Sequence, residues 1–222
     1  MKVSVVIPVY NEERTVAELI DKVKNVNLDK EIIVVNDGST DRTSEIISKI
    51  NGIKYFNLQQ NRGKGYALRE GFKQVTGDVV IVQDADLELN PEEYTELIKP
   101  IVNNETKIVY GSRFLTNPYT NFISMMANKA VTITANVLYN AELTDEATCY
   151  KIFTKDVLKD IDLKCTRFEF CPEFTAKVLK KGYSIKELPI SFKPRFKEDG
   201  KKVRWRDGFE ALWTLLKYRF VD

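Results

Sequence analysis

Val79–Glu88, VVIVQDADLE, joins an apolar run to two carboxylates one residue apart. The β-branched run over residues 79–82 is typical of a strand buried in a parallel sheet. Asp84 and Asp86 then fall at the carboxyl end of that strand, the edge at which open α/β sheets bind ligands. Alternate residues of an extended chain point the same way, so both acids are placed to share one divalent cation, Mg²⁺ or Mn²⁺. The alternative for an isolated D-x-D is an ordinary acidic turn after a strand.

The composition limits the chemistry that the chain can perform. Its 222 residues favour one domain with an elaborated C-terminal part over two domains. A net charge of only +2 gives no general attraction for polyanions, and no repeated aromatic-basic platform indicates nucleic-acid binding. The absence of histidine excludes Ser-His-Asp and Cys-His catalysis and histidine-bound zinc. Any general base must be Asp, Glu, Lys or Tyr, or the acceptor must arrive already ionised.

The cysteines and the N-terminus predict a cytoplasmic location. The three cysteines, Cys149, Cys165 and Cys171, lack C-x-x-C spacing and are expected to be reduced thiols. Met1 leads almost directly into the first predicted strand, so no secretory signal is expected. No uninterrupted apolar run reaches the about 18 residues of a membrane span.

Strand and helix patterns alternate through about residue 111. Apolar strands are predicted at 2–8, 31–35, 53–57, 79–82 and 107–110, with helical spacing of apolar residues between them. This order predicts an α/β fold with a mostly parallel central sheet flanked by helices. The first, second, fourth and fifth of these strands would end together at one edge, so the polar segments after them should line a single crevice.

The pattern changes after Arg113. The apolar stretch 122–138 is interrupted by polar residues and predicts helices beside the crevice, and an edge strand is expected within 183–192. Residues 193–206 are basic, and a final helix carries an apolar stripe of Phe209, Leu212, Trp213, Leu216 and Phe220. Together with Trp205 and Trp213, the basic stretch favours docking on an anionic membrane surface. The alternative is a basic loop followed by a helix packed into the core.

Two turns are candidates for ligand contact. Gly63-Lys64-Gly65 opens a predicted helix, and a helix N-terminus with a lysine favours a phosphate, although the turn can also be purely structural. It lacks the spacing of a P-loop, and no G-x-G-x-x-G follows the first strand. Asp37 follows the second strand and is placed either to accept from a ribose or base or to cap a turn.

Four motifs occur in one order that matches a known family. They are PVYNEE (8–13), VVNDGSTD (34–41), NRGKGYALREGF (61–72) and GDVVIVQDADLELNPEE (77–93). They closely resemble those of the inverting family 2 glycosyltransferases, and most closely the polyprenyl-phosphate or dolichol-phosphate mannosyl- and glucosyltransferases. The resemblance implies a single GT-A domain, with a nucleotide-sugar-binding half (1–111), an acceptor-binding half (112–195) and a basic amphipathic C-terminal segment (196–222).

The resemblance also implies roles on the donor side. Pro8, Tyr10 and Glu12 would frame the nucleotide base. Asp37 would contact the base or ribose, and Lys64 would lie near the nucleotide. In the same family, the residues matching Asp84 and Asp86 bridge the metal to the diphosphate, and the position of Glu88 can complete the metal shell.

On the acceptor side the match is looser. The family's G-S-R is present at 111–113, with Arg113 facing the acceptor phosphate, and LTD and YK (143–145, 150–151) resemble its D-x-x-x-G-F-[RK] segment, with Cys149-Tyr150 in place of Gly-Phe. ELPI (187–190) with Arg195 resembles another family motif. Arg113, Lys129 and Arg195 would position a lipid phosphate, which needs no protein base. For a hydroxyl acceptor, Asp145 is the candidate base, or else a residue that caps a turn.

The sequence therefore predicts a metal-dependent inverting glycosyltransferase that moves a hexose from a nucleotide-diphosphate sugar to a polyprenyl phosphate at the cytoplasmic membrane face. A family 2 enzyme acting on a saccharide or other hydroxyl is the alternative. A nucleotidyltransferase and a catalytically silent nucleotide-sugar-binding module are further alternatives.

Overall fold

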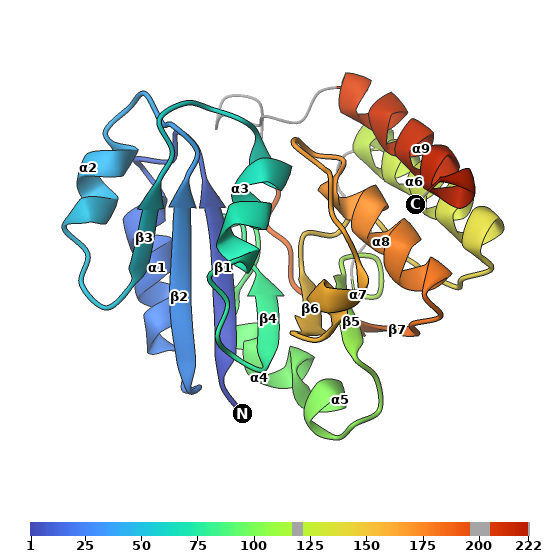
Figure 1. Ribbon diagram of the computed structural model, residues 1–222, viewed down its shortest axis with the longest axis horizontal. Helices are drawn as coiled ribbons and strands as arrows, with labels where there is room; N and C mark the ends of the chain where they lie inside the picture. The colour runs from blue at the N-terminus through green and yellow to red at the C-terminus, as the bar shows by residue number, and fades with distance from the viewer. Residues whose placement is uncertain (117–121, 196–204, 222) are drawn as a thin grey trace.

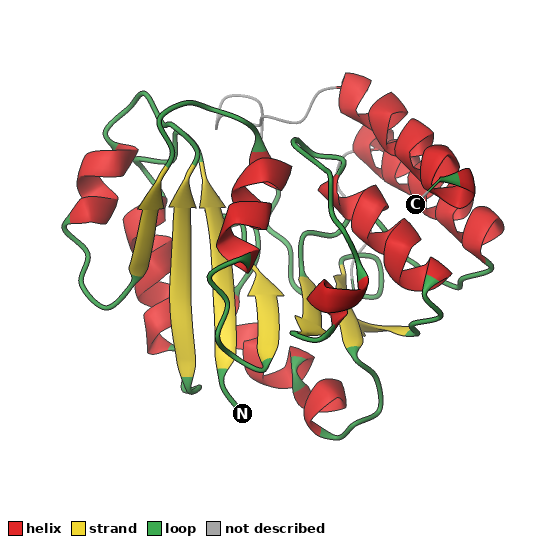
Figure 2. Cartoon of the chain, viewed as in Figure 1, coloured by secondary structure: helices red, strands yellow, loops and turns green. Residues whose placement is uncertain are grey.

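A seven-stranded sheet forms the centre of the molecule, with helices on both of its faces (Figures 1 and 2). The computed structural model describes residues 1–116, 122–195 and 205–221. The strands are β1 (Val3–Val9), β2 (Lys30–Asn36), β3 (Lys54–Asn57), β4 (Val79–Val82), β5 (Ile108–Ser112), β6 (Lys151–Thr154) and β7 (Ile185–Pro189). The helices are α1 (Val16–Asn25), α2 (Thr43–Ser48), α3 (Lys64–Phe72), η1 (Pro91–Glu93), α4 (Tyr94–Leu97), α5 (Lys99–Val102), α6 (Phe122–Tyr139), α7 (Val157–Asp160), α8 (Phe170–Lys180) and α9 (Trp205–Phe220).

The strand order is β3-β2-β1-β4-β6-β5-β7, and the sheet is mostly parallel as predicted. β6 is the exception, since it pairs antiparallel with both β4 and β5. β1, β2, β4 and β5 therefore end at the same edge, and β6 begins there. The prediction that polar segments after these four strands share one edge is confirmed.

The two faces of the sheet bury separate apolar clusters, because successive residues of a strand point to opposite sides. In β1, Val5 and Ile7 pack in the cluster that includes α1 and α4, whereas Val6 packs in the cluster that includes α3 and α8. All three side chains are fully buried, and each contributes roughly 1.5–3 kcal/mol of apolar transfer free energy. The strand is therefore held in place from both faces.

A third layer of helices covers α8 on the side away from the sheet. Phe174 of α8 packs in the sheet cluster, while Ala176 packs with Val131 of α6 and with Leu215 and Tyr218 of α9. Figure 1 shows α6 and α9 side by side beyond α8. The apolar stretch 122–138 forms one helix here, rather than several.

The segment after β4 departs from the single helix that its spacing suggests. Asn90 caps its start, since the Asn90 Oδ1 accepts a hydrogen bond from the Glu92 amide at 3.2 Å. The helix is then divided into η1, α4 and α5, with Pro100 inside the last piece. Proline lacks an N–H and disfavours helical geometry in the residue before it, which accounts for the break near Ile98 and Lys99.

Candidate active site

The turn after β1 is tied to the turn after β2 at the carboxyl edge of the sheet. The Asn11 amide donates to Ser39 Oγ at 2.9 Å, and the Glu12 amide donates to Thr43 Oγ1 at 2.8 Å. Tyr10 is the first residue beyond β1, while Pro8 is buried inside the strand. The structure therefore brings the predicted base-framing residues to the same edge as the loop after β2, and their contact with a base stays a prediction.

Asp37 fixes the start of α3. Its two carboxylate oxygens accept hydrogen bonds from the Arg62 and Gly63 amides at 2.8 and 2.7 Å. Burial raises the pKa of Asp37, against the lowering effect of these two hydrogen bonds. Gly63 has φ +97°, and a Cβ on it would lie 2.4 Å from the Thr166 carbonyl oxygen. Asp37 thus positions the Gly63-Lys64-Gly65 turn, which is the capping role, and its contact with ribose or base stays a prediction.

The end of β4 is anchored by a buried glutamine. Gln83 Oε1 accepts hydrogen bonds from the hydroxyl groups of Tyr94 and Tyr150 at 2.6 and 2.8 Å. Beyond it, Leu87 adopts φ +61°, a left-handed conformation that costs a residue with a Cβ about 1–2 kcal/mol. The backbone is thus held in an unusual course between Asp86 and Glu88.

Lys64 meets Asp84 at this edge. Its Nζ lies 2.5 Å from Asp84 Oδ1, and both side chains are largely buried. Burial alone would lower the pKa of the Lys64 ammonium, but the Asp84 carboxylate outweighs burial and raises it well above its usual value. The predicted phosphate-binding lysine and the first predicted metal ligand are therefore in direct contact.

Asp86 lies in a region rich in negative charge. Burial, then the Asp84 and Glu88 carboxylates, raise the pKa of Asp86 to about 7, while Arg195 opposes the shift. Among the described residues, no three His, Cys, Asp or Glu side chains are arranged to hold a metal ion by themselves. Asp84 and Asp86 nonetheless fit a Mg²⁺ or Mn²⁺ ion. These ions bind one or two carboxylates and complete their shell with substrate phosphates, and the charge of Asp84 already raises the pKa of Asp86.

Arg195 joins the segment after β7 to the segments that follow β1 and β4. Its guanidinium donates to both Glu12 carboxylate oxygens, at 3.2 and 2.7 Å, and to the Asp86 carbonyl oxygen at 2.9 Å. Its amide donates to Glu88 Oε1 at 2.7 Å. Arg195, predicted to face the acceptor, is thus brought together with three of the predicted donor-side residues.

Arg113 and Asp145 form a buried ion pair near the end of β5. The Arg113 Nε and Nη2 atoms each lie 2.7 Å from an Asp145 carboxylate oxygen, and the Arg113 amide donates to Oδ2 at 3.0 Å. Glu187 of β7 accepts from the Thr144 and Asp145 amides at 2.6 and 2.9 Å. Since both oxygens of Asp145 accept from Arg113, this carboxylate is placed to orient the arginine.

The predicted residues of the second half are not all brought together. Lys129 is exposed on α6, whereas Arg113 and Arg195 are held by buried carboxylates. Most of the predicted stripe of the final helix faces outward, since Phe209, Trp213 and Phe220 are 67%, 64% and 79% exposed, whereas Leu212 is partly buried against the third cluster. Leu215 and Tyr218 form its buried face instead. Residues 196–204 of the basic stretch, and the side chain of Trp205, lie outside the described residues.

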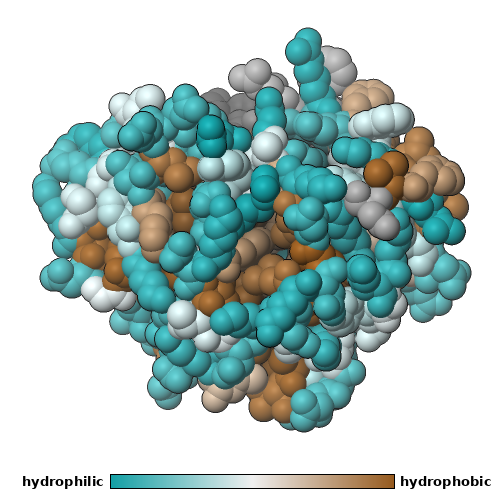
Figure 3. All heavy atoms as spheres, viewed as in Figure 1, coloured by the Kyte–Doolittle hydropathy of each residue, from teal (hydrophilic) through white to brown (hydrophobic). Residues whose placement is uncertain are grey.

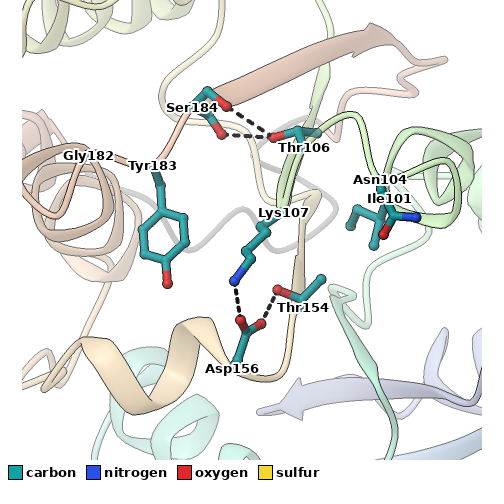
Figure 4. Close-up of a pocket in the computed structure, with 9 residues that line it drawn as sticks. All are labelled: Ile101, Asn104, Thr106, Lys107, Thr154, Asp156, Gly182, Tyr183 and Ser184. Carbon is teal, nitrogen blue, oxygen red and sulfur yellow. Dashed lines mark hydrogen bonds and ion pairs between the residues drawn. The ribbon is translucent and has the colours of Figure 1, made fainter.

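A pocket of about 490 Å³ lies at the opposite edge of the sheet (Figure 4). It is lined by residues around the start of β5, the end of β6 and the start of β7. The two charged residues that line the pocket form an ion pair with each other, with Lys107 Nζ 2.5 Å from Asp156 Oδ2. It is remote from the carboxyl ends of the parallel strands, and none of the predicted site residues lines it.

Three contacts of the site could not be predicted from single motifs. Gln83 anchors the end of β4 before Asp84, and Glu187 holds the Thr144 and Asp145 amides. Cys149 Sγ accepts a hydrogen bond from Lys64 Nζ at 3.2 Å. The available signals were the Cys-Tyr pair that replaces Gly-Phe and the ELPI motif that contains Glu187.

Comparisons with known proteins agree with this geometry. The family model described as glycosyl transferase family 2 matches residues 4–162. The chain is 32% identical to the low-salt glycan biosynthesis hexosyltransferase of Haloferax volcanii, over 99% of this chain and 53% of that protein. It is 30% identical to the dolichol-phosphate mannosyltransferase of Pyrococcus furiosus, over 98% of this chain and 64% of that protein. The chain therefore spans between half and two thirds of the length of these relatives.

Solved structures also share the fold. Glucosyl-3-phosphoglycerate synthase from Mycobacterium tuberculosis, in complex with Mn²⁺, UDP and glucosyl-3-phosphoglycerate, superposes with a TM-score of 0.79. The alignment covers 100% of this chain and 81% of that one at 18% identity. The same enzyme has been solved with Mg²⁺ and UDP. At this identity the likeness concerns the fold, and the predicted GT-A fold is confirmed.

Proposed function

This chain belongs to glycosyl transferase family 2, and on that premise we propose that it transfers a hexose from a nucleotide-diphosphate sugar to a polyprenyl or dolichyl phosphate. The observation that carries the proposal is the contact of Lys64 with Asp84 beside Asp86, where β4 ends at the shared edge of the sheet. A relative named dolichol-phosphate mannosyltransferase supports the choice of acceptor. One displacement at the anomeric carbon would invert its configuration.

On the donor side, this chain's residues prepare a place for a diphosphate and its cation. Asp84 and Asp86 would hold Mg²⁺ or Mn²⁺, which when bound neutralises charge that develops on the leaving diphosphate. Lys64 is close enough to Asp84 to contact a phosphate oxygen beside the same ion. Arg195 is held by Glu12 and keeps the loop after β7 against this group.

On the acceptor side, the ion pair of Arg113 with Asp145 favours an ionised nucleophile. A lipid phosphate is already an anion and needs no base, whereas a sugar hydroxyl must lose a proton. Asp145 is fully buried and both of its oxygens accept from Arg113, so it is poorly placed to take that proton. The fixed guanidinium supplies what a phosphate acceptor needs, which is an oriented positive group.

We also propose that α6 and α9 contact the membrane that carries such an acceptor. α9 exposes Phe209, Trp213, Leu216 and Phe220 at spacings of four, three and four residues, and α6 exposes Met126, Ile133 and Val137. Figure 3 shows apolar side chains at the surface in the region of these helices. Exposed Lys129 and Lys217 stand among them. No helix within the described ranges has the length and apolar character to cross a bilayer, so the proposal concerns contact with its surface.

Donor and acceptor can be tested separately. Thermal shift with GDP- and UDP-sugars, with and without Mn²⁺, should reveal stabilisation by one donor, and Asp86→Ala should remove the part that depends on metal. Polyprenyl phosphate should then accept the sugar, with release of nucleoside diphosphate. Transfer to free saccharides alone would favour the hydroxyl-acceptor alternative, and release of pyrophosphate would identify a nucleotidyltransferase.

The membrane contact has its own test. Trp213→Ser and Phe220→Ser should reduce co-sedimentation with vesicles of anionic and neutral phospholipids. Their melting temperature should hardly change, because both side chains are mostly exposed. Lys99→Ser, at an exposed position on α5, serves as the matched control. If a variant that combines Trp213→Ser and Phe220→Ser binds vesicles as well as the unmodified chain does, the proposal that this surface contacts the membrane is wrong.

A further inference from the structure

Two free thiols lie beside the donor site. Cys149 stands two residues before β6, and Cys171 is the second residue of α8. Lys64 Nζ contacts both Cys149 Sγ, at 3.2 Å, and Asp84 Oδ1, at 2.5 Å. Cys171 Sγ lies 3.6 Å from the carbonyl oxygen of Thr148, the residue before Cys149. The side chains of Cys149 and Cys171 also share a hydrogen bond, so the two sulfurs lie together next to the lysine expected to meet the diphosphate.

We propose that Cys149 and Cys171 are a reversible thiol–disulfide site, and that closing the bridge weakens nucleotide binding through Lys64. The formation of the bridge is independent of the enzyme's reaction, whereas its effect on the nucleotide rests on the function proposed above. Both cysteines are partly buried, whereas Cys165 is buried.

The electrostatics of the pair suit thiol–disulfide exchange. Hydrogen bonding from Cys149 lowers the pKa of Cys171, against the effect of burial, and Lys151 and Lys64 lower it further. The same hydrogen bond, followed by burial, raises the pKa of Cys149. Cys171 is thus the better attacking thiolate, and Cys149 keeps its proton until the second step.

The exchange balances with a low-molecular-weight disulfide, RSSR, as the oxidant. The Cys171 thiolate attacks one sulfur of RSSR, forms a mixed disulfide and releases RS⁻. Cys149 then loses its proton and attacks Cys171 Sγ, which releases the second RS⁻. Two protein thiols are oxidised and one RSSR is reduced to two RSH.

Closing the bridge changes the surroundings of Lys64. The Cys149 sulfur must approach Cys171 to about 2.05 Å, and it is then no longer available as a thiol or thiolate partner for the ammonium. Lys64 then keeps only Asp84 of these two partners. The ion pair of Lys64 with Asp84 becomes tighter and competes with a metal ion for the Asp84 carboxylate. Weakening of Mn²⁺-dependent nucleotide binding on the order of fivefold is expected, the effect of about one hydrogen bond.

The test uses the full chain and a Cys165→Ala variant, which leaves only the two thiols of interest. Cys165 is buried and serves as the matched position, and thermal unfolding verifies that its replacement is tolerated. Folded protein is incubated with oxidised glutathione, its thiols are counted, and its peptides are mapped by mass spectrometry. Binding of GDP and UDP with Mn²⁺ is measured by calorimetry before oxidation, after oxidation and after dithiothreitol. Cys149→Ser cannot close the bridge, and comparison of its affinity before and after oxidation isolates the effect of a mixed disulfide at Cys171.

The expected result is the loss of two thiols, a peptide linked through Cys149 and Cys171, and weaker nucleotide binding that dithiothreitol restores. Thiols that persist in the folded chain, or a bridge to Cys165 in the unmodified chain, would overturn the site. A correct bridge with unchanged nucleotide affinity would overturn its coupling to Lys64. If the reduced protein binds neither nucleotide, the proposed function fails and the coupling fails with it, while the thiol count and peptide map still decide the bridge.

Discussion

Replacement of Asp145 by alanine separates two roles for this residue, a general base and a holder of Arg113. The Asp145 side chain is fully buried and Arg113 is 10% exposed, so water does little to replace a lost partner. The substitution removes two side-chain hydrogen bonds of 2.7 Å and a third, of 3.0 Å, from the Arg113 amide. It leaves a buried guanidinium without this carboxylate.

The magnitude follows from that arrangement. Removal of one partner from a buried ion pair costs about 3–5 kcal/mol of unfolding free energy. For a chain of this size, each kcal/mol lowers the melting temperature by roughly 2–4 °C, so a decrease of roughly 10 °C is expected. Asp145→Asn should cost about half as much, since its amide oxygen can still accept from Arg113.

The assay combines thermal unfolding with steady-state kinetics. Glu96→Ala, which removes an exposed ion pair with Lys99 on the same chain, is the control and should leave the melting temperature unchanged. Asp145→Asn should raise the KM for the acceptor phosphate, because Arg113 loses its fixed orientation. An unchanged melting temperature, together with a collapse of kcat at constant KM, would refute this reasoning and restore Asp145 as the base.

Three further predictions concern charge and backbone. Glu31→Gln should lower the free energy of unfolding at pH 7, measured in urea. It should also reduce the fall of that free energy with decreasing pH in the acid range. Burial opposes ionisation of Glu31, but hydrogen bonds led by Lys54 hold its pKa well below the usual value. Its stabilisation is therefore complete above about pH 4.3 and is lost as the pH falls further. Gly63→Ala should lower the melting temperature and weaken nucleotide binding, because a Cβ would meet the Thr166 carbonyl at a backbone with φ +97°. Mn²⁺ affinity, followed by calorimetry, should rise between pH 6 and 8 and lose that dependence in Asp86→Asn, since the proton on Asp86, whose pKa is about 7, competes with the ion.

The edge at which the site forms could be predicted because it depends on backbone order. Five apolar runs alternate with helical patterns, and parallel strands must end together, so the placement of Tyr10, Asp37 and Asp84 at one edge followed from the sequence alone. The apolar run of β4 was long enough to identify a strand buried on both faces. The order of the strands and the direction of a parallel sheet do not depend on the details of side-chain packing.

Other features depend on contacts between distant segments, which periodicity does not encode. The antiparallel direction of β6 is set by its neighbours, and the pairing of Lys64 with Asp84 needs both turns to be placed. The apolar stripe of α9 was recognised, but spacing alone does not say which side of a helix faces the core. Tyr218 and Leu215, on another side, pack against α8 and α6, and this turns all of the stripe except Leu212 outward.

The charges around the end of β4 favour a divalent cation at the proposed donor site. Four carboxylates, those of Glu12, Asp84, Asp86 and Glu88, meet two cationic side chains, Lys64 and Arg195. Two negative charges are left in excess when all groups are ionised. Burial, and then the neighbouring Asp84 and Glu88 carboxylates, raise the pKa of Asp86. A divalent cation removes that excess, and a diphosphate then restores negative charge within reach of Lys64 and completes the ion's shell. Near Arg113 the buried carboxylate of Asp145 balances the guanidinium, so charge there is already compensated. What Arg113 offers to an acceptor phosphate in the proposed reaction is therefore an oriented hydrogen-bond donor, whereas the excess negative charge that a cation would balance lies at the end of β4.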